Sequence, residues 1–269
     1  MTTTTPDRGL PEGIETLRAE ADEFARWATE EYCRRHPDLV LSPRGRELCR
    51  EDMRHHIEFL HATALTHQPG PFVRYTRWLR DLLQSRGMNG AHVARSLELI
   101  PEYFTDRLPE AALAWLRECV AAALDGLADP RPEPLVPPLA SPALPETGKF
   151  LEALLASDRR GAEQVLVDGI AAGRQLVDVG VGIVQPAMYE IGRLWQENRI
   201  SVAQEHLATA LSQNALVRAF ALAVFRPMHE RRIMLACVPG NQHCLGLRVV
   251  SDALEADGWQ VQYLGADVP

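Results

Sequence analysis

The stretch "LWQENRISVAQEH", residues 194–206, carries side chains whose types and spacing could do chemistry. Trp195 stands ten positions before an adjacent acid and imidazole, Glu205 and His206. Such a pair can hold or exchange a proton, and the imidazole can bind a metal ion. A structural alternative stays open: a tryptophan in a helical core, followed by an exposed Glu–His pair whose acid suits the first turn of a helix.

A second candidate is His243 in "NQHCLG", residues 241–246. One interpretation is a turn histidine that merely caps the next helix. The other is an axial metal ligand, whose second ring nitrogen needs a neighbour to fix its tautomer. Gly246 would then let a flat ligand approach the backbone closely.

Helices must position the first group. Ser201 and Gln204 form a capping-box pattern that starts a helix after "ENRI". Trp195 is therefore expected about one turn before the end of one helix, with Glu205 and His206 about one turn into the next. Helical spacing over 148–157, 159–173, 175–198 and 201–225 predicts a four-helix bundle within residues 148–227, and a tight antiparallel corner would bring the three side chains together at one end.

A strand, a helix and a second strand must position His243. "RRIMLACV" reads as a strand, "LGLRVVSDALEADG" has helical spacing, and "WQVQYLGADVP" reads as a second strand. This is the opening unit of a parallel α/β sheet over residues 228–269, and His243 follows its first strand at the carboxyl edge, where such sheets bind ligands. Since two strands make a poor sheet, we expect the remainder of this domain to be missing.

The first part of the chain reads as all-helical. Apolar residues recur at helical spacing over 1–128, with helices expected at about 72–86, 91–105 and 109–127. Residues 129–147 hold seven prolines and are predicted to form a semi-rigid linker. The predicted fold class is thus an α domain, a linker, a bundle and the start of a Rossmann-like α/β domain.

Composition narrows the functional classes. The 269 residues carry a net charge of -8, which argues against coating nucleic acid. There is no apolar run long enough for a membrane span, and "MTTTTPDRG" does not resemble a secretory signal. We expect a cytoplasmic protein without a membrane partner, and five free, mostly buried cysteines.

"NQHCLG" resembles the [D/E]xHxxG signature of cobalamin-binding Rossmann domains, with Asn241 where an acid is usual. The resemblance implies that His243 is the lower cobalt ligand. Asn241 can still accept an imidazole N–H bond, although it raises the basicity of the ligand less than a carboxylate would. Methyl carriers, mutases and sensors all share this lower-face motif.

The W-x9-EH pattern of Trp195, Glu205 and His206 resembles that of cobalamin-dependent photoreceptors of the CarH and LitR type. The resemblance implies that Trp195 packs against the adenosyl group of adenosylcobalamin and that Glu205 hydrogen-bonds to it. After light breaks the cobalt–carbon bond, His206 would take the vacated position. Met188 and Tyr189 are candidates to line the same pocket, or are plain core residues.

The N-terminal part departs from that group, because no basic, strand-containing MerR-type module precedes residue 130. Direct DNA binding is therefore not expected. Cationic and imidazole groups concentrate here instead, and Arg and His beside apolar surface could hold a dianionic tetrapyrrole. The candidates are Arg74, Arg77, Arg80, His56 and His67, with the two histidines expected at the margin of an apolar stripe. The alternative is a solvated basic face.

This arrangement of domains resembles the photocobilins, which pair cobalamin with biliverdin. The sequence thus predicts a light-sensing adenosylcobalamin protein that is not an enzyme, has biliverdin as a candidate second chromophore, and changes its domain packing or homo-oligomeric state in light. The leading alternative is a corrinoid methyl carrier or methyltransferase partner. A mutase is a weaker reading, because no substrate barrel is present.

Overall fold

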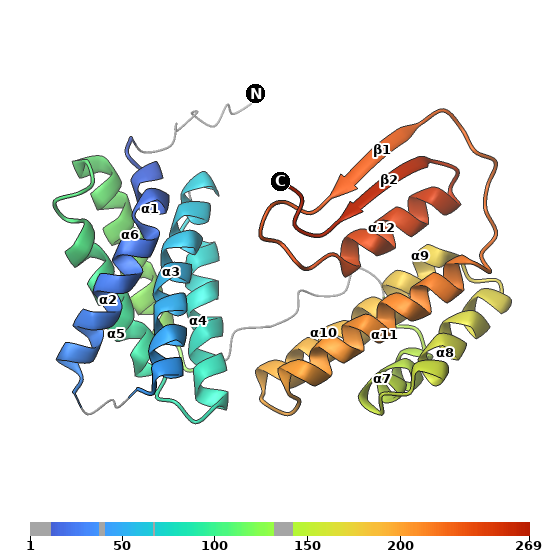
Figure 1. The fold of residues 1–269 in the computed structure, drawn as a ribbon, viewed down its shortest axis with the longest axis horizontal. Coiled ribbons are helices and arrows are strands. Elements are labelled where there is room, and N and C mark those ends of the chain that lie inside the picture. Colours follow the sequence, from blue (N-terminus) through green and yellow to red (C-terminus); the bar gives the residue numbers. More distant parts are fainter. Residues whose placement is uncertain (1–11, 38–40, 67, 132–141) are drawn as a thin grey trace. The chain divides into compact units, whose positions relative to one another are not determined.

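A computed structural model describes residues 12–37, 41–66, 68–131 and 142–269. The chain divides into two compact units, Met1–Pro134 and Leu135–Pro269 (Figure 1). Each unit has its own cluster of buried apolar side chains. The division falls within the segment predicted as a linker, and each unit is described separately below.

The described residues of the N-terminal unit form six helices and no strand. They are α1 Glu15–Ala19, α2 Ala21–Arg35, α3 Pro43–Thr66, α4 Gly70–Ser85, α5 Ala91–Phe104 and α6 Glu110–Leu127. Phe24, Phe72, Phe104 and Leu116 are fully buried at its centre. The helical prediction agrees with this. Glu20, with a φ of -96° and a ψ of 1°, separates α1 from α2.

The second unit begins with a bundle of helices. They are α7 Thr147–Leu155, α8 Arg159–Ala171, α9 Leu176–Val179, the π-helical turn η1 Gly180–Val184, α10 Gln185–Gln196 and α11 Val202–Phe220. Phe150, Leu166 and Ala215 are fully buried in its core. The predicted helices agree with α7, α8 and α9–α10, but the last was expected to reach residue 225 and ends at Phe220.

Two glycines in the π-helical turn pack closely against neighbouring segments. A Cβ on Gly180 would come within 2.4 Å of a methyl carbon of Val249, and one on Gly182 within 2.7 Å of Leu144. Both glycines are buried. Here the helix therefore touches α12 and the segment before α7 more closely than any larger residue allows.

A parallel β-α-β unit follows, as the sequence predicts. Strand β1, Arg232–Ala236, pairs in parallel with β2, Gln260–Gly265, and Leu235 lies opposite Tyr263. Helix α12, Leu245–Ala256, lies between this sheet and the bundle (Figure 1). Through Leu245, Val249 and Ala256 it packs against the bundle core. The loop that carries His243 therefore leads directly into a helix that lies between the sheet and the bundle.

Candidate functional site

The corner between α10 and α11 is fixed by hydrogen bonds at both helix ends. Asn198 has a φ of 58° and donates its N–H to the carbonyl of Trp195, while Arg199 donates to Leu194. These two bonds form a Schellman motif, in which asparagine tolerates the left-handed conformation. On the other side Ser201 and Gln204 form the predicted capping box. The short connection turns the chain sharply and sets the position of Glu205 and His206.

Glu205 and His206 form a hydrogen-bonded pair in the first turns of α11. His206 Nδ1 lies 2.6 Å from Glu205 Oε2, and the Thr209 hydroxyl donates to Glu205 Oε1 at 3.0 Å. A carboxylate only accepts, so the hydrogen of the neutral ring lies on Nδ1. Nε2 then keeps its lone pair. With 75% of the His206 side chain exposed, this nitrogen is accessible to a metal centre.

Glu205 thus binds the neighbouring imidazole here. The resemblance to the photoreceptors implies a hydrogen bond between Glu205 and the adenosyl group, and that contact stays a prediction. An imidazole whose second nitrogen is held by a carboxylate is the usual arrangement of a protein metal ligand. The pair has this chemistry whether or not Glu205 also contacts a cofactor.

The other residues predicted for the upper face lie on α10. Trp195 is partly buried one residue before the end of the helix. Met188 packs against the bundle core and its sulfur accepts a hydrogen bond from the Ser212 hydroxyl at 3.2 Å. The Tyr189 hydroxyl accepts from Gln185 at 3.1 Å. Met188 and Tyr189 are both half-buried, so their role in lining a pocket stays a prediction.

His243 is exposed on the loop between β1 and α12. Asn241 Oδ1 accepts the backbone N–H of His243 at 2.8 Å, so the amide holds the main chain here, and a bond from the imidazole ring to Asn241 stays a prediction. Gly246 lies in the first turn of α12, where an added Cβ would meet no protein atom within 4 Å. The described residues give no steric reason for glycine at this position, and its contact with a ligand stays a prediction.

Two residues that the sequence analysis missed tie this loop to the end of β2. Asp267 accepts the N–H of Gly240 at 2.7 Å and donates its own N–H to Asn241 at 3.0 Å. The Tyr263 hydroxyl donates to the carbonyl of Cys244 at 3.3 Å. Both contacts span about twenty residues or more, and neither has a signal in local sequence patterns.

The part of the chain that contains the corner between α10 and α11 matches a known protein family. Residues 148–218 match the family described as "B12 binding domain". The matched segment runs from α7 into α11 and contains Trp195, Glu205 and His206. This match supports cobalamin as the cofactor class of the second unit.

Two relatives are transcriptional repressors from Myxococcus xanthus. The chain is 38% identical over 88 residues to "HTH-type transcriptional repressor CarA", covering 33% of this chain and 28% of the relative. It is 30% identical over 132 residues to "HTH-type transcriptional repressor CarH", covering 47% and 43%. The chain thus spans less than half the length of either relative. This similarity agrees with the resemblance to CarH found in the sequence.

Among solved structures, the chain is similar to the methanol:cobalamin methyltransferase complex MtaBC from Methanosarcina barkeri. The sequence identity is 20% and the TM-score 0.29, over 46% of this chain and 48% of the other.

The residues present fit a corrin-bound cobalt. In the described ranges no group of three or more His, Cys, Asp or Glu could hold a metal ion by itself. A corrin itself supplies most of the ligands of its cobalt, so a single imidazole from the protein would be sufficient to hold it. His206, with an accessible Nε2, and His243, exposed beside an open glycine, have the required donor chemistry.

His56 in the N-terminal unit is a core residue, which corrects its expected place at the margin of an apolar stripe. It is 1% exposed, and both ring nitrogens are bonded, Nδ1 to the Tyr75 hydroxyl at 3.0 Å and Nε2 to Ser96 at 2.9 Å. Ser96 donates its own hydrogen to the carbonyl of Val93. Nε2 must therefore carry the ring hydrogen. Burial lowers the pKa of His56 to about 3, so the ring is neutral and offers no charge to a bilin.

Arg77 and Arg80 have structural partners. Arg80 is 6% exposed and donates to the carbonyls of Leu127, Asp129 and Arg131, and Arg77 also donates to Arg131. They fix the chain that leaves α6. Arg74 is exposed on α4, and His67 lies outside the described residues. These contacts explain Arg77 and Arg80 without a ligand, and the bilin site stays a prediction.

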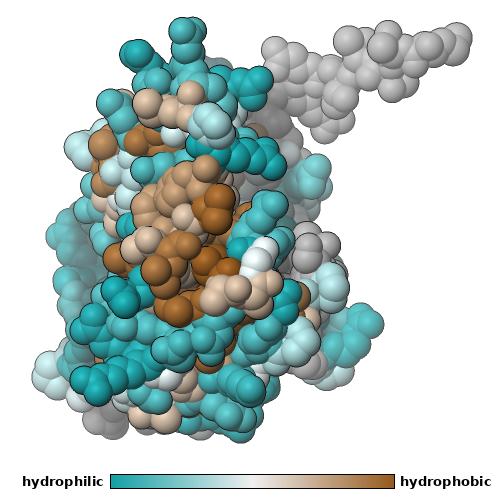
Figure 2. All heavy atoms as spheres, turned by 90° about the vertical axis from the view of Figure 1, so that its right-hand side faces the viewer, coloured by the Kyte–Doolittle hydropathy of each residue, from teal (hydrophilic) through white to brown (hydrophobic). Residues whose placement is uncertain are grey.

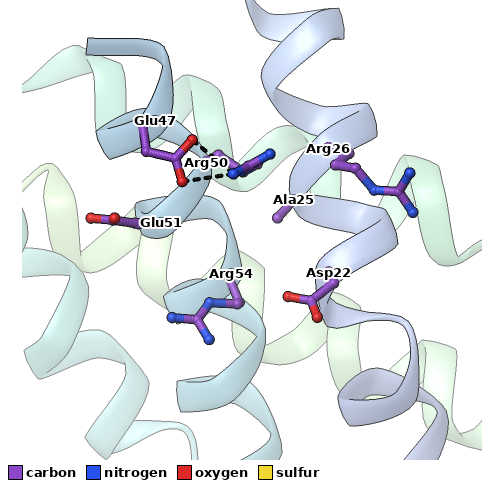
Figure 3. A pocket seen from close by; sticks show the side chains of 7 residues that line it. All are labelled: Asp22, Ala25, Arg26, Glu47, Arg50, Glu51 and Arg54. Atoms are coloured by element: carbon purple, nitrogen blue, oxygen red, sulfur yellow. Dashed lines mark hydrogen bonds and ion pairs between the residues drawn. The ribbon is translucent and has the colours of Figure 1, made fainter. Parts of the chain in front are cut away.

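A charged pocket of about 380 Å³ lies between α2 and α3 (Figure 3). Figure 3 shows Arg50 hydrogen-bonded to both carboxylate oxygens of Glu47, its neighbour on the same helix. The lining residues are Asp22, Ala25, Arg26, Glu47, Arg50, Glu51 and Arg54. Its acids and arginines balance each other at the surface, so the pocket favours no particular ligand.

The second unit also exposes apolar surface. Figure 2 shows apolar side chains gathered on one face and bordered by hydrophilic ones. In the segment after α11, Val224 is 92% and Met228 76% exposed. A hollow of about 760 Å³ lies at the amino-terminal ends of β1 and β2, with Phe225, Met228 and Trp259 among its lining residues. It lies at the opposite ends of the strands from His243. No described helix is long and apolar enough to cross a membrane.

Proposed function

We propose that this chain is a cobalamin-dependent light sensor in which His206 replaces an adenosyl group as the upper ligand of cobalt. The observation that carries the proposal is the Glu205–His206 pair, which holds Nδ1 and leaves Nε2 accessible within a B12 binding domain. When bound, adenosylcobalamin supplies a cobalt–carbon bond that green light breaks. His243 serves as the lower ligand.

Each residue contributes a separate physical step. Trp195 covers the adenosyl group and keeps water from it. Glu205 holds the His206 ring in the tautomer that can coordinate, so less entropy is lost when the ligand exchanges. Ligation by His206 would change how the bundle packs against the β-α-β unit, or how copies of the chain associate. The protein acts as a cytoplasmic sensor and not as an enzyme.

We expect an output other than the DNA binding that the names of the relatives, HTH-type repressors, imply. A MerR-type DNA-binding module contains strands, whereas the described residues of the N-terminal unit form helices and no strand. The net charge of -8 also opposes binding to a polyanion. Signalling through a protein contact is therefore favoured over direct DNA binding.

Illumination of the loaded protein tests the proposal. The full chain with adenosylcobalamin is expected to change its visible spectrum under green light and to return slowly, if at all, in darkness. His206→Ala should leave dark binding nearly intact and destabilise the illuminated product. His229→Ala, which changes a half-buried histidine of the same unit that has no role in the proposal, serves as the control. A spectrum unchanged by light, or equal light products in His206→Ala and the parent, would refute the assignment.

The alternative function is a corrinoid methyl carrier or methyltransferase partner. It uses His243 and the bundle but has no need of Trp195, Glu205 and His206 together. In that case methylcobalamin would bind and lose its methyl group to an added thiol or similar acceptor in darkness, and His206→Ala would behave like the parent protein. The two functions therefore give opposite results with one variant.

Biliverdin is the proposed second chromophore. Arg74 is the exposed candidate, and Arg77 and Arg80 would have to leave backbone carbonyls to bind a propionate. Mixing the full chain with biliverdin should produce a red-shifted, protein-induced spectrum, and Arg74→Ala should weaken it without affecting cobalamin uptake. Biliverdin that keeps its free spectrum would remove it from the proposal.

A further inference from the structure

The carbonyl of Cys244 is a point where the His243 loop is attached to the rest of the fold. It immediately follows His243 in the chain and caps the start of α12, where it accepts the N–H of Arg248 at 2.9 Å. The Tyr263 hydroxyl donates to the same oxygen at 3.3 Å. One donor thus comes from the helix itself, and the other from the neighbouring strand β2.

The Tyr263 ring also lies beside Arg248 of α12. The Arg248 guanidinium lies 5.8 Å from the centre of the Tyr263 ring, and its Nε donates to Asp252 at 2.6 Å. Asp252 is 3% exposed, on the face of α12 that packs against the bundle. Burial raises the pKa of Tyr263 to about 12, so its hydroxyl remains a donor over the physiological range. The ring therefore reaches Cys244 from a fixed position.

Helix α11 also contacts Cys244. Gln213 Nε2 lies 3.9 Å from the Cys244 sulfur, within the range of a weak hydrogen bond to sulfur. Gln213 and His206 are seven residues apart, which is about two turns of one helix. The start of α12 is thus fixed between β2 and the helix that carries His206.

We propose that Tyr263 is the positioning residue for His243: by binding the Cys244 carbonyl it fixes the backbone from which the imidazole is presented. The part of this proposal that concerns metal ligation rests on the proposed function. The part that concerns the order of the loop does not. Tyr263 itself touches neither metal nor cofactor.

The first arm of the test uses cofactor-free full-length protein. Tyr263→Phe keeps the ring and removes only the hydroxyl, so amide hydrogen exchange at His243 and Cys244 should become about fivefold faster, as expected for the loss of one hydrogen bond. Tyr103→Phe is the matched control, because it removes a hydroxyl bonded to Glu20 in the other unit. It should leave exchange in the loop unchanged. Equal exchange in Tyr263→Phe and the parent would overturn the proposal.

The second arm uses cob(II)alamin as the probe. Electron paramagnetic resonance shows a nitrogen splitting when an imidazole is the axial ligand, and protein labelled with ¹⁵N-histidine identifies its source. Tyr263→Phe should lower the histidine-ligated fraction severalfold, while Tyr103→Phe should not. Faster loop exchange with an unchanged splitting would refute the positioning of His243. Failure of the parent to bind cobalamin would instead refute the proposed function, since the exchange result is measured without cofactor.

A second variant keeps the test decisive if Tyr263→Phe does not fold. Arg248→Gln leaves the hydroxyl in place but removes the guanidinium beside the ring and the ion pair with Asp252. It should produce a smaller increase in loop exchange in the same direction. Loop exchange equal to that of the parent would show that the Tyr263 ring needs no such support and would overturn this part of the proposal.

Discussion

Replacing Asp52 by Asn is expected to stabilise the N-terminal unit near neutral pH. Asp52 lies on α3, where burial, together with the negative charge of Glu51, raises the pKa of its carboxyl from 3.8 to about 6. The folded chain therefore binds this proton more tightly than the unfolded chain. Between these two values the folded state carries more protons, so the free energy of unfolding falls as the pH rises through that window.

The size of the effect follows from the shift. A change from 3.8 to about 6 corresponds to roughly 3 kcal/mol at most. Asp52 keeps some exposure to solvent, which reduces the cost of its charge to about 1–2 kcal/mol. Asparagine has nearly the same shape without the charge. Asp52→Asn should raise the free energy of unfolding by that amount above pH ~7, and the gain should vanish below pH ~4.

His56 has the opposite pH dependence and must be separated from Asp52. Burial lowers its pKa from 6.5 to about 3, so between these values the unfolded chain binds more protons and stability rises with pH. This slope is common to the parent and the variant. It cancels in the difference between them, and only the Asp52 contribution remains.

Urea unfolding of the full chain over a series of pH values measures this difference, with hydrogen exchange in α3 identifying the transition of the N-terminal unit. Glu98→Gln, which removes an exposed carboxylate from α5, is the control and should change stability by less than about 0.5 kcal/mol at every pH. A stabilisation that is the same at acidic and neutral pH, or a loss of stability at neutral pH, would refute the argument from burial.

Three further changes test the second unit. Glu205→Gln replaces the charged hydrogen-bond acceptor of His206 by a neutral one and should weaken imidazole ligation after illumination roughly tenfold. Competition with free imidazole measures this effect, and Glu163→Gln on α8 is the control. Equal competition in the two variants would contradict the role of the carboxylate. Ser201→Ala should cost about 1 kcal/mol in urea unfolding, because the side chain caps α11; no loss would mean that the bond has no net value. Phe150→Ala should cost about 3–5 kcal/mol in the transition of the second unit alone, and an equal loss in both transitions would contradict separate cores.

Local sequence patterns predicted the structural elements that depend mainly on neighbouring residues. Ser201 and Gln204 are three residues apart, so their capping box depends on no distant contact, and the structure contains it. The alternation of strand and helix formers after residue 230 likewise predicted the parallel pairing of β1 and β2. These elements set the positions of His206 and His243, which explains why the sequence could identify both as candidates.

Contacts between distant segments could not be predicted in the same way. The helical pattern over residues 175–198 is continuous, yet Gly180 begins a π-helical turn and packs closely against Val249 of α12. Arg80 had the sequence features of a ligand-binding cation but is used to bind carbonyls some fifty residues away. Tyr263 gave no signal at all. In each case the decisive partner is set by tertiary packing.

Helix α11 connects the two proposed ligand positions mechanically. One face of it is buried through Ala208, Ala215 and Ala219, whose small side chains let the helix pack closely in the bundle. A movement of His206 therefore displaces the bundle as a body more readily than it bends α11. The contact of α12 with the bundle core is smaller, through Leu245, Val249 and Ala256. In the proposed function, ligation by His206 would therefore be accommodated at the α12 contact, which also holds the buried Asp252 and supports the loop of His243.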